Sequence, residues 1–208
     1  MALQIEIWSD YVCPFCYLEE PVLRRMKEEF GDEIALRWRA FELRPEPVPT
    51  LPPHGDYLVD IWDRAVYPMA RERGMTLKLP PVQPRSRLAL EAAEQARAEG
   101  KFDLMHRAIF RAFFEEGRDI GQIETLLDLG EGCGLERAAL AEALTSGKHR
   151  AHVLADERLA VELGVSGVPA MLLRREGEEL AAARTLSGAQ PEFMVRATLQ
   201  HLLQNPAA

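Results

Sequence analysis

The 208-residue sequence has only three cysteines, no block of basic residues and no apolar run near the length of a membrane-spanning helix. Three cysteines are too few for the disulfide framework that stabilises many small secreted domains. The net charge of −8 comes from acidic and basic residues mixed along the chain, which gives no reason to expect nucleic-acid or membrane-surface partners. The N-terminus has no basic region followed by an apolar one, so we expect no secretory signal and a cytoplasmic protein.

Two of the cysteines form the motif Cys13-Pro14-Phe15-Cys16, directly after the apolar run from Ile5 to Trp8. That run indicates a buried strand, and Pro14 suits the first position of a helix, where its missing N–H costs nothing. Cys13 would then lie at the helix N-terminus, where unpaired N–H groups and the helix dipole stabilise the reactive thiolate. Cys16 lies one turn further on the same face, close enough to form a disulfide. The motif therefore predicts a thiol–disulfide active site.

The same cysteine spacing also occurs in zinc sites, which need about four ligands. Here Cys133 or a distant histidine would have to join, and the nearest histidine in sequence, His54, follows a proline-rich segment. We therefore expect no metal. Cys133 itself has no cysteine near it in sequence, and we interpret it as a structural or incidental thiol, with a regulatory thiol as the alternative.

Periodicity predicts a block of helices between two groups of strands. Strands are expected at 3–9, 34–41, 170–173 and 180–186, and a helix after Cys16 carries apolar residues at four-residue spacing up to Phe30. Five prolines between 45 and 53 predict an extended linker. Helices are expected at 56–73, 86–100, 102–114, 135–144, 149–163 and 190–203, with Asp119 and Gln122 as the capping box of one more.

This order, with the two cysteines after the first strand, resembles the thioredoxin superfamily and most closely its DsbA-like branch. Pro21 stands eight residues after Cys13, where thioredoxins have a helix-kinking proline, and Gly167-Val168-Pro169-Ala170 is similar to the cis-proline loop that faces the dithiol. The resemblance implies an α/β thioredoxin fold with a large all-helical insertion. Residues 1–50 and 165–208 would form the thioredoxin-like domain, and 51–164 the helical insertion domain.

Further segments are similar to the FrnE-like oxidoreductases of the cytoplasm. They are Asp10 to Tyr17, Phe41 to Pro45, Gly164 to Pro169 and Ser187 to Gln190. They lie toward both ends of the chain, whereas the insertion matches in helical character only.

The resemblance also implies roles for single residues. Cys13 would be the exposed nucleophile and Cys16 the buried resolving thiol. The Val168–Pro169 bond would be cis, and the backbone of Val168 would be free to pair with an extended substrate peptide. Pro14 and Phe15 would contact the substrate. A phenylalanine at position 15 carries no charge to stabilise the thiolate, so we expect a pair less oxidising than the strongest oxidants of this group.

Two acidic residues, Asp10 and Glu6, lie near the thiols in sequence. Either could transfer a proton to or from Cys16. Asp10 could equally cap the turn between strand and helix, which we favour. The role of Glu6 depends on whether its side chain points inward.

We therefore predict a thiol–disulfide oxidoreductase or disulfide isomerase that acts on protein, peptide or small-thiol substrates. It would need no cofactor beyond its own dithiol, with glutathione as a candidate electron donor or acceptor and oxidative stress as a context. One alternative is a glutathione-dependent isomerase or transferase of the kappa-class or hydroxychromene-carboxylate isomerase type. Such enzymes resemble this chain but have serine at the position of Cys13 and no resolving cysteine. The other alternative is a non-catalytic peptide-binding chaperone module.

Overall fold

The computed structural model describes residues 2–205, whose strands form one four-stranded sheet in the order β2-β1-β3-β4. The strands are β1 (Leu3–Ser9), β2 (Ile34–Ala40), β3 (Ala170–Arg175) and β4 (Arg184–Ser187). β1 runs parallel to β2 because the helix α1 (Pro14–Phe30) crosses between them. β3 is antiparallel to both of its neighbours, and Ile5 is paired with Leu36 on one side and Leu173 on the other.

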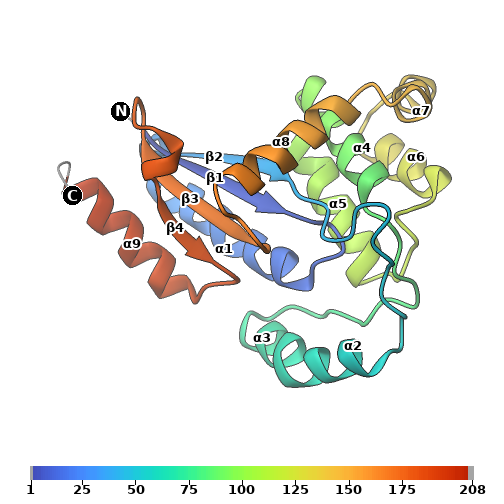
Figure 1. Ribbon diagram of the computed structural model, residues 1–208, viewed down its shortest axis with the longest axis horizontal. Coiled ribbons are helices and arrows are strands. Elements are labelled where there is room, and N and C mark those ends of the chain that lie inside the picture. Colours follow the sequence, from blue (N-terminus) through green and yellow to red (C-terminus); the bar gives the residue numbers. More distant parts are fainter. Residues whose placement is uncertain (1, 206–208) are drawn as a thin grey trace.

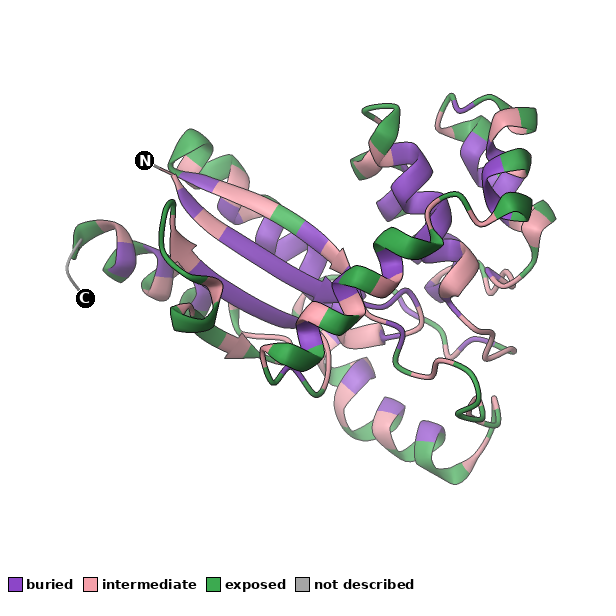
Figure 2. Cartoon of the chain, turned by 45° about the horizontal axis from the view of Figure 1, so that its top comes forward, coloured by how far each residue is buried: buried purple, intermediate pink, exposed green. Residues whose placement is uncertain are grey.

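Alternation along β1 buries both faces of the sheet (Figure 2). Leu3, Ile5 and Ile7 pack against α1 and the C-terminal helix α9 (Glu192–Gln204). On the opposite face, Trp8 packs with Ala160 of α8 (Arg150–Glu162), and its indole Nε1–H donates to the carbonyl oxygen of Asp156 at 2.9 Å. The strand that leads to Cys13 is therefore held from both sides.

The remaining helices lie between β2 and β3 in sequence. They are α2 (Asp56–Ile61), a π-helical turn (Trp62–Val66), α3 (Tyr67–Glu72), α4 (Arg87–Ala98), α5 (Phe102–Phe114), α6 (Ile123–Gly132) and α7 (Arg137–Ser146). Figure 1 shows α4 to α7 grouped at one end of the sheet, with α2 and α3 as a separate arm. Short 3-10 turns at Gly31–Glu33 and Leu180–Ala182 complete the chain. The predicted thioredoxin fold, with a helical insertion between β2 and β3, is confirmed.

Some local predictions were wrong. The strand predicted at 180–186 begins only at Arg184, because residues 180–182 form a 3-10 turn first. Asp119 does not cap α6: that helix begins after Gln122, and Asp119 Oδ1 accepts instead from the N–H of Gly121 at 2.9 Å. The helix predicted at 56–73 is interrupted by the π-helical turn and ends at Glu72.

The predicted domain limits stay a prediction, and two observations bear on them. α8 lies inside the predicted insertion but packs on the sheet. Cys13, Cys16 and Leu18 share one apolar cluster with α4, α5 and α6, so the active-site helix and the insertion have a common core. Among residues 2–205, no helix combines the length and the apolar character needed to cross a bilayer.

Candidate active site

The two thiols are positioned by the turn from β1 into α1. Cys13 is the N-cap residue of α1, with an extended backbone (φ −93°, ψ 112°), and Pro14 is the first helical residue. The N–H groups of Cys16 and Tyr17 both donate to the carbonyl oxygen of Cys13, at 3.1 and 3.4 Å. Neither thiol is in a disulfide; Cys13 is 4% exposed and Cys16 is fully buried. The sulfur of Cys13 therefore lies at the positive end of the helix, as the motif predicts.

The loop before β3 lies against Cys13. The Val168–Pro169 bond is cis, as predicted, and the thiol of Cys13 donates to the carbonyl oxygen of Val168 at 3.4 Å. The carbonyl of Pro169 accepts from the N–H of Gly188 at 2.8 Å, which fixes the far side of the loop. Among the described residues, no acceptor binds the backbone N–H of Val168. A free N–H beside the reacting sulfur is what strand-like pairing with a substrate would require.

Cys16 is held in its protonated form. Burial raises the pKa of the Cys16 thiol well above its usual value, and the neighbouring sulfur of Cys13 raises it further. The backbone of Asp10 and the side chain of Ser9 lower the same pKa, but by less. The two cysteines thus differ in environment, one at the rim of a pocket and one in the core.

Cys13 opens onto a pocket of about 320 Å³. Pro14, Phe15 and Val168, three of the predicted substrate contacts, line it, whereas Pro169 is not part of its lining. The opposite walls come from the linker after β2 and from the insertion: Glu42, Leu43, Arg44, Thr50, Leu51, Tyr57, Leu58, Ile61, Trp62, Gln83, Pro84, Arg85 and Ser86. None of these residues was predicted from the sequence to line the pocket. The segment from Phe41 to Pro45 was identified only as similar to the FrnE-like oxidoreductases.

Asp10 is fully buried and joins two segments. Its carboxylate accepts from the N–H of Val12 at 3.3 Å and from the N–H of Leu43 at 2.7 Å. Burial raises its pKa from 3.8 to about 6, the nearby Ser86 side chain and both backbone N–H groups lower it, and the Glu42 charge raises it. This is the turn-capping geometry that the sequence favoured. The backbone of Asp10, and not its carboxylate, is hydrogen-bonded to the Cys16 thiol, which lowers the pKa of that thiol.

Glu6 lies among arginines. Its carboxylate accepts from Nε of Arg39 at 2.7 Å, and Arg37 and Arg174 lie 3.8 and 3.7 Å away. Arg39 in turn binds Asp156 at 2.5 Å. In the part of the chain that the structure describes, Glu6 makes no hydrogen bond to either active-site thiol. Its geometry is that of an ion pair that ties β1 to β2 and β3.

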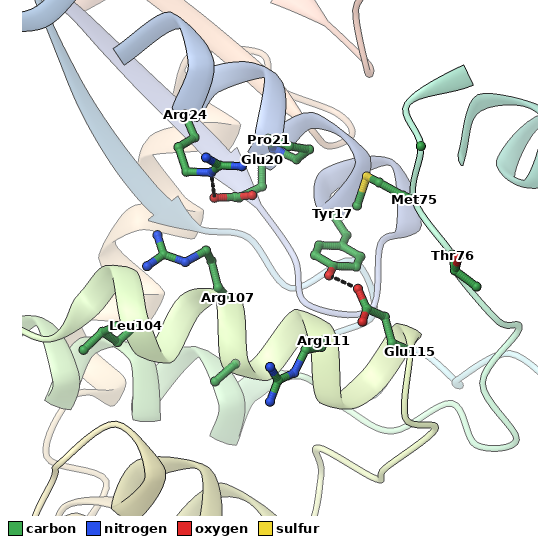
Figure 3. A pocket seen from close by; sticks show the side chains of 12 residues that line it. Tyr17, Glu20, Pro21, Arg24, Met75, Thr76, Leu104, Arg107, Arg111 and Glu115 are labelled. Carbon is green, nitrogen blue, oxygen red and sulfur yellow. Dashed lines mark hydrogen bonds and ion pairs between the residues drawn. The ribbon is translucent and has the colours of Figure 1, made fainter. Parts of the chain in front are cut away.

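A second pocket, of about 840 Å³, lies between α1 and α5 (Figure 3). Tyr17 donates to Oε1 of Glu115 at 2.5 Å at one end, and Glu20 pairs with Arg24 at 3.8 Å at the other. Neither active-site cysteine lines this pocket, so the smaller pocket beside Cys13 is the one placed for thiol chemistry.

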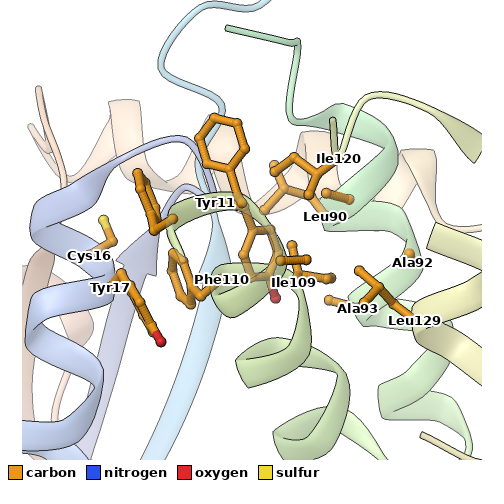
Figure 4. Packing of buried hydrophobic residues seen from close by; sticks show 14 of the residues in the cluster. Tyr11, Cys16, Tyr17, Leu90, Ala92, Ala93, Ile109, Phe110, Ile120 and Leu129 are labelled. Atoms are coloured by element: carbon orange, nitrogen blue, oxygen red, sulfur yellow. The ribbon is translucent and has the colours of Figure 1, made fainter. Parts of the chain in front are cut away.

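Aromatic rings on either side of the motif fix it to the insertion (Figure 4). Tyr11 and Tyr17 both contact Phe110 of α5, with ring centroids 4.8 and 5.1 Å apart. The Tyr11 hydroxyl is also hydrogen-bonded to Nδ1 of His106 at 2.9 Å. Burial lowers the pKa of His106 to about 3, so this imidazole is neutral at physiological pH. Phe110, Phe113 and their neighbours form core, as the sequence suggested.

His149 and His152, which could share a helix face and bind a metal, make other contacts, as does Cys133. Within residues 2–205, no three histidine, cysteine or acidic side chains are grouped so as to hold a metal ion. His149 is bonded to Gln95 at 2.8 Å, and His152 lies 3.5 Å from Glu94. Cys133 is a half-buried thiol at the end of α6, and burial raises its pKa.

Comparison with known proteins identifies the family to which this chain is similar. The model of the DSBA-like thioredoxin domain matches residues 4–200. The uncharacterized protein YwbO of Bacillus subtilis is 35% identical over 147 residues, which cover 69% of this chain and 72% of that protein.

Two solved structures show the fold across the whole length. The cytosolic disulfide reductase DsbM of Pseudomonas aeruginosa, solved with glutathione (GSH), is 26% identical with a TM-score of 0.72, over 97% of this chain and 99% of that one. A 2-hydroxychromene-2-carboxylate isomerase is 21% identical with a TM-score of 0.77, over 98% of each chain. The same fold thus occurs with two chemistries, and only the residues at the site can distinguish them.

Proposed function

We propose that this chain, which belongs to the DSBA-like thioredoxin domain family, exchanges disulfides with thiol substrates through Cys13 and Cys16. One observation carries the proposal: Cys13 caps α1 at the rim of a pocket, with its sulfur 3.4 Å from the carbonyl oxygen of Val168, and Cys16 is buried one turn behind it. Both thiols are present in this chain, whereas the resemblance to the isomerase type implies a serine at the position of Cys13 and no second cysteine.

The exchange proceeds in two displacements. The Cys13 thiolate attacks one sulfur of a substrate disulfide, so a mixed disulfide forms and the other substrate sulfur leaves as a thiolate. Cys16 then loses its proton and attacks Sγ of Cys13, which expels the second substrate thiolate and closes the Cys13–Cys16 disulfide. The substrate gains two electrons and two protons, and the protein pair is oxidised by two electrons.

The high pKa of Cys16 gives this order a physical reason. A buried thiol that stays protonated cannot compete with Cys13 for the incoming disulfide, because only the thiolate is nucleophilic. Once the mixed disulfide has formed, Cys13 no longer carries a negative charge beside Cys16, so that charge no longer raises the pKa of Cys16. Deprotonation of Cys16 becomes easier at the step that needs it.

The reduced pair is restored by a thiol reductant, two molecules of which form one disulfide. Glutathione is the reductant we propose, supported by the similarity to a disulfide reductase solved with it. That relative is described as cytosolic, which supports the cytoplasmic setting expected from the sequence. We propose protein or peptide disulfides as substrates, because the free N–H of Val168 offers a main-chain donor beside the sulfur.

Three variants test the proposal. Wild-type protein equilibrated with glutathione buffers of increasing oxidation should lose and regain two protons reversibly, as measured by intact mass and thiol trapping. Cys16→Ser should stop after the first displacement and accumulate the mixed disulfide, and Cys13→Ser should do neither. Cys133→Ser, the control, should behave like the wild type.

Two results would contradict the proposal. A pair that never closes across the glutathione series would exclude dithiol exchange. Peptide binding that survives in Cys13→Ser, combined with no exchange by the wild type, would identify the chaperone-like module instead.

A further inference from the structure

The pocket beside Cys13 contains a carboxylate that the exchange reaction does not use. Glu42 follows β2 by two residues, and its side chain is only 3% exposed. Its Oε2 oxygen accepts from Nη2 of Arg87 at 2.5 Å. Its Oε1 oxygen is buried and has no hydrogen-bond partner within residues 2–205. Buried carboxylate oxygens rarely stay unpaired, because an unmet acceptor costs free energy.

The position of Glu42 relative to the reacting sulfur is fixed by its neighbours. The N–H of Phe41 donates to the carbonyl of Ser9 at 3.1 Å, and the N–H of Leu43 donates to Asp10 at 2.7 Å. These bonds fasten the Glu42 segment to the same loop that carries Cys13. Glu42 and Cys13 both line the pocket of about 320 Å³, so the Glu42 side chain belongs to the wall that a bound substrate would meet, with Oε1 buried behind its surface.

The charges around Glu42 indicate what kind of donor suits it. Arg87 pairs with both Glu42 and Glu157. Two further guanidinium groups, Arg44 and Arg85, line the same pocket, and Arg85 is paired with Glu46 at 3.4 Å. Three guanidinium groups thus offset the carboxylates of Glu42, Glu46 and Glu157, so an ammonium group would meet two cations at the pocket wall and a carboxylate that Arg87 already pairs. A neutral N–H meets no such repulsion, and a hydrogen bond from it to a charged oxygen is stronger than one between neutral groups.

We propose that Glu42 Oε1 accepts a hydrogen bond from the amide N–H that adjoins the reacting sulfur of the substrate, such as the main-chain N–H of a substrate cysteine. This rests on the proposed function and names the substrate class: amide-bearing thiols and disulfides. Glu42 is then a specificity-determining residue, on the wall of the pocket contributed by the linker, whereas Val168 is on the wall contributed by the cis-proline loop.

The test uses three small disulfides with the full-length protein, all with two carbons between sulfur and nitrogen: those of N-acetylcysteamine, N-methyl-N-acetylcysteamine and cysteamine. The first carries the amide N–H, the second lacks it, and the third carries an ammonium group instead. We expect wild-type kcat/KM for the secondary amide to exceed that for the tertiary amide by about 10- to 100-fold beyond the ratio for uncatalysed exchange with glutathione.

Glu42→Gln removes the acceptor with almost no change in shape. Because Arg87 is a donor, the new carbonyl oxygen faces Arg87 and the amide nitrogen takes the place of Oε1. The ratio of secondary to tertiary amide should fall to that of uncatalysed exchange, mainly through a higher KM for the secondary amide. Glu157→Gln is the matched control, since Glu157 binds Arg87 at 3.3 Å but does not line this pocket. Its ratio should match the wild type.

Several outcomes would overturn the inference. An equal fall in both variants would mean that the Arg87 cluster only maintains the pocket's shape. An unchanged ratio in Glu42→Gln, or no preference for the secondary amide in the wild type itself, would leave water as the partner of Oε1. An effect confined to cysteamine disulfide would assign the donor as an ammonium group. If the wild type turns over none of the three, the proposed function fails, a result distinct from turnover without discrimination.

Discussion

Replacement of Asp10 by asparagine should change how the stability of the protein depends on pH. Asp10 is buried, and its pKa rises from 3.8 to about 6 on folding, chiefly because burial disfavours the charge. At 1.36 kcal/mol for each pH unit, this difference corresponds to about 3 kcal/mol. Between these two pKa values the folded state binds more protons than the unfolded state, so the contribution of Asp10 to stability is present at low pH and is lost as the pH rises to about 6.

An asparagine side chain cannot lose a proton, so Asp10→Asn lacks this pH dependence. The free energy of unfolding of the wild type should therefore fall relative to the variant by about 3 kcal/mol between pH 3.5 and pH 7. The variant also has one acceptor oxygen for the two N–H groups of Val12 and Leu43, which adds a constant offset of about 1–2 kcal/mol. The test therefore lies in the slope with pH and not in the offset.

Urea unfolding of both proteins under reducing conditions, at half-unit pH steps, measures this difference. Asp32→Asn is the matched control, because it makes the same replacement at a side chain that is fully exposed, where no burial disfavours the charge. The difference in the free energy of unfolding between wild type and Asp10→Asn should change with pH, because burial disfavours the charged carboxylate of Asp10. A difference that changes by less than about 0.5 kcal/mol from pH 4 to pH 7 would refute the reasoning.

Two packing predictions concern the insertion. Phe110→Ala should lower the free energy of unfolding by about 3–5 kcal/mol, because the ring is fully buried and stacked on Tyr17 at 5.1 Å; a loss below about 1 kcal/mol in urea unfolding would contradict this. Gly130→Ala should lower the free energy of unfolding by about 1–3 kcal/mol, because the added Cβ would lie 2.4 Å from Cδ2 of Leu140. Gly132→Ala in the same helix is the control: the added Cβ would have no atom within 4 Å, so the free energy of unfolding should not fall. Equal losses at both positions would refute the steric explanation.

The parts of the fold that the sequence predicted well are those set by local patterns. The apolar run of β1, the proline at the start of α1 and the Gly-Val-Pro sequence before β3 each specify backbone geometry within a few residues. The two cysteines and the cis bond at Pro169 followed from such patterns. The extent of β4 did not, because the turn at Leu180–Ala182 competes with the strand and only pairing with β3 decides where it begins.

The walls of the thiol pocket could not be predicted, because they depend on contacts between distant parts of the chain. Glu42 is one charged residue in a linker, and nothing local shows that Arg87 will bind one of its oxygens and leave the other unpaired. Tyr57 and Trp62 line the pocket only because the arm of α2 and α3 lies beside the end of the sheet. Asp10 shows the intermediate case, since its bond to Val12 is local and its bond to Leu43 is not.

Besides lining the pocket beside Cys13, the helical insertion helps to bury Cys16. The burial that raises the pKa of Cys16 is created within a cluster shared with Phe110 and Ile109 of α5, far along the chain from the motif. The helix N-terminus is a local feature of the motif, but the burial that keeps Cys16 protonated one turn further on needs packed neighbours. The asymmetry between attacking and resolving thiol therefore depends on the packing of this shared cluster as well as on the motif. Truncation of Phe110 should lower the pKa of Cys16 as water reaches it, and that change would separate the role of packing from the role of the motif.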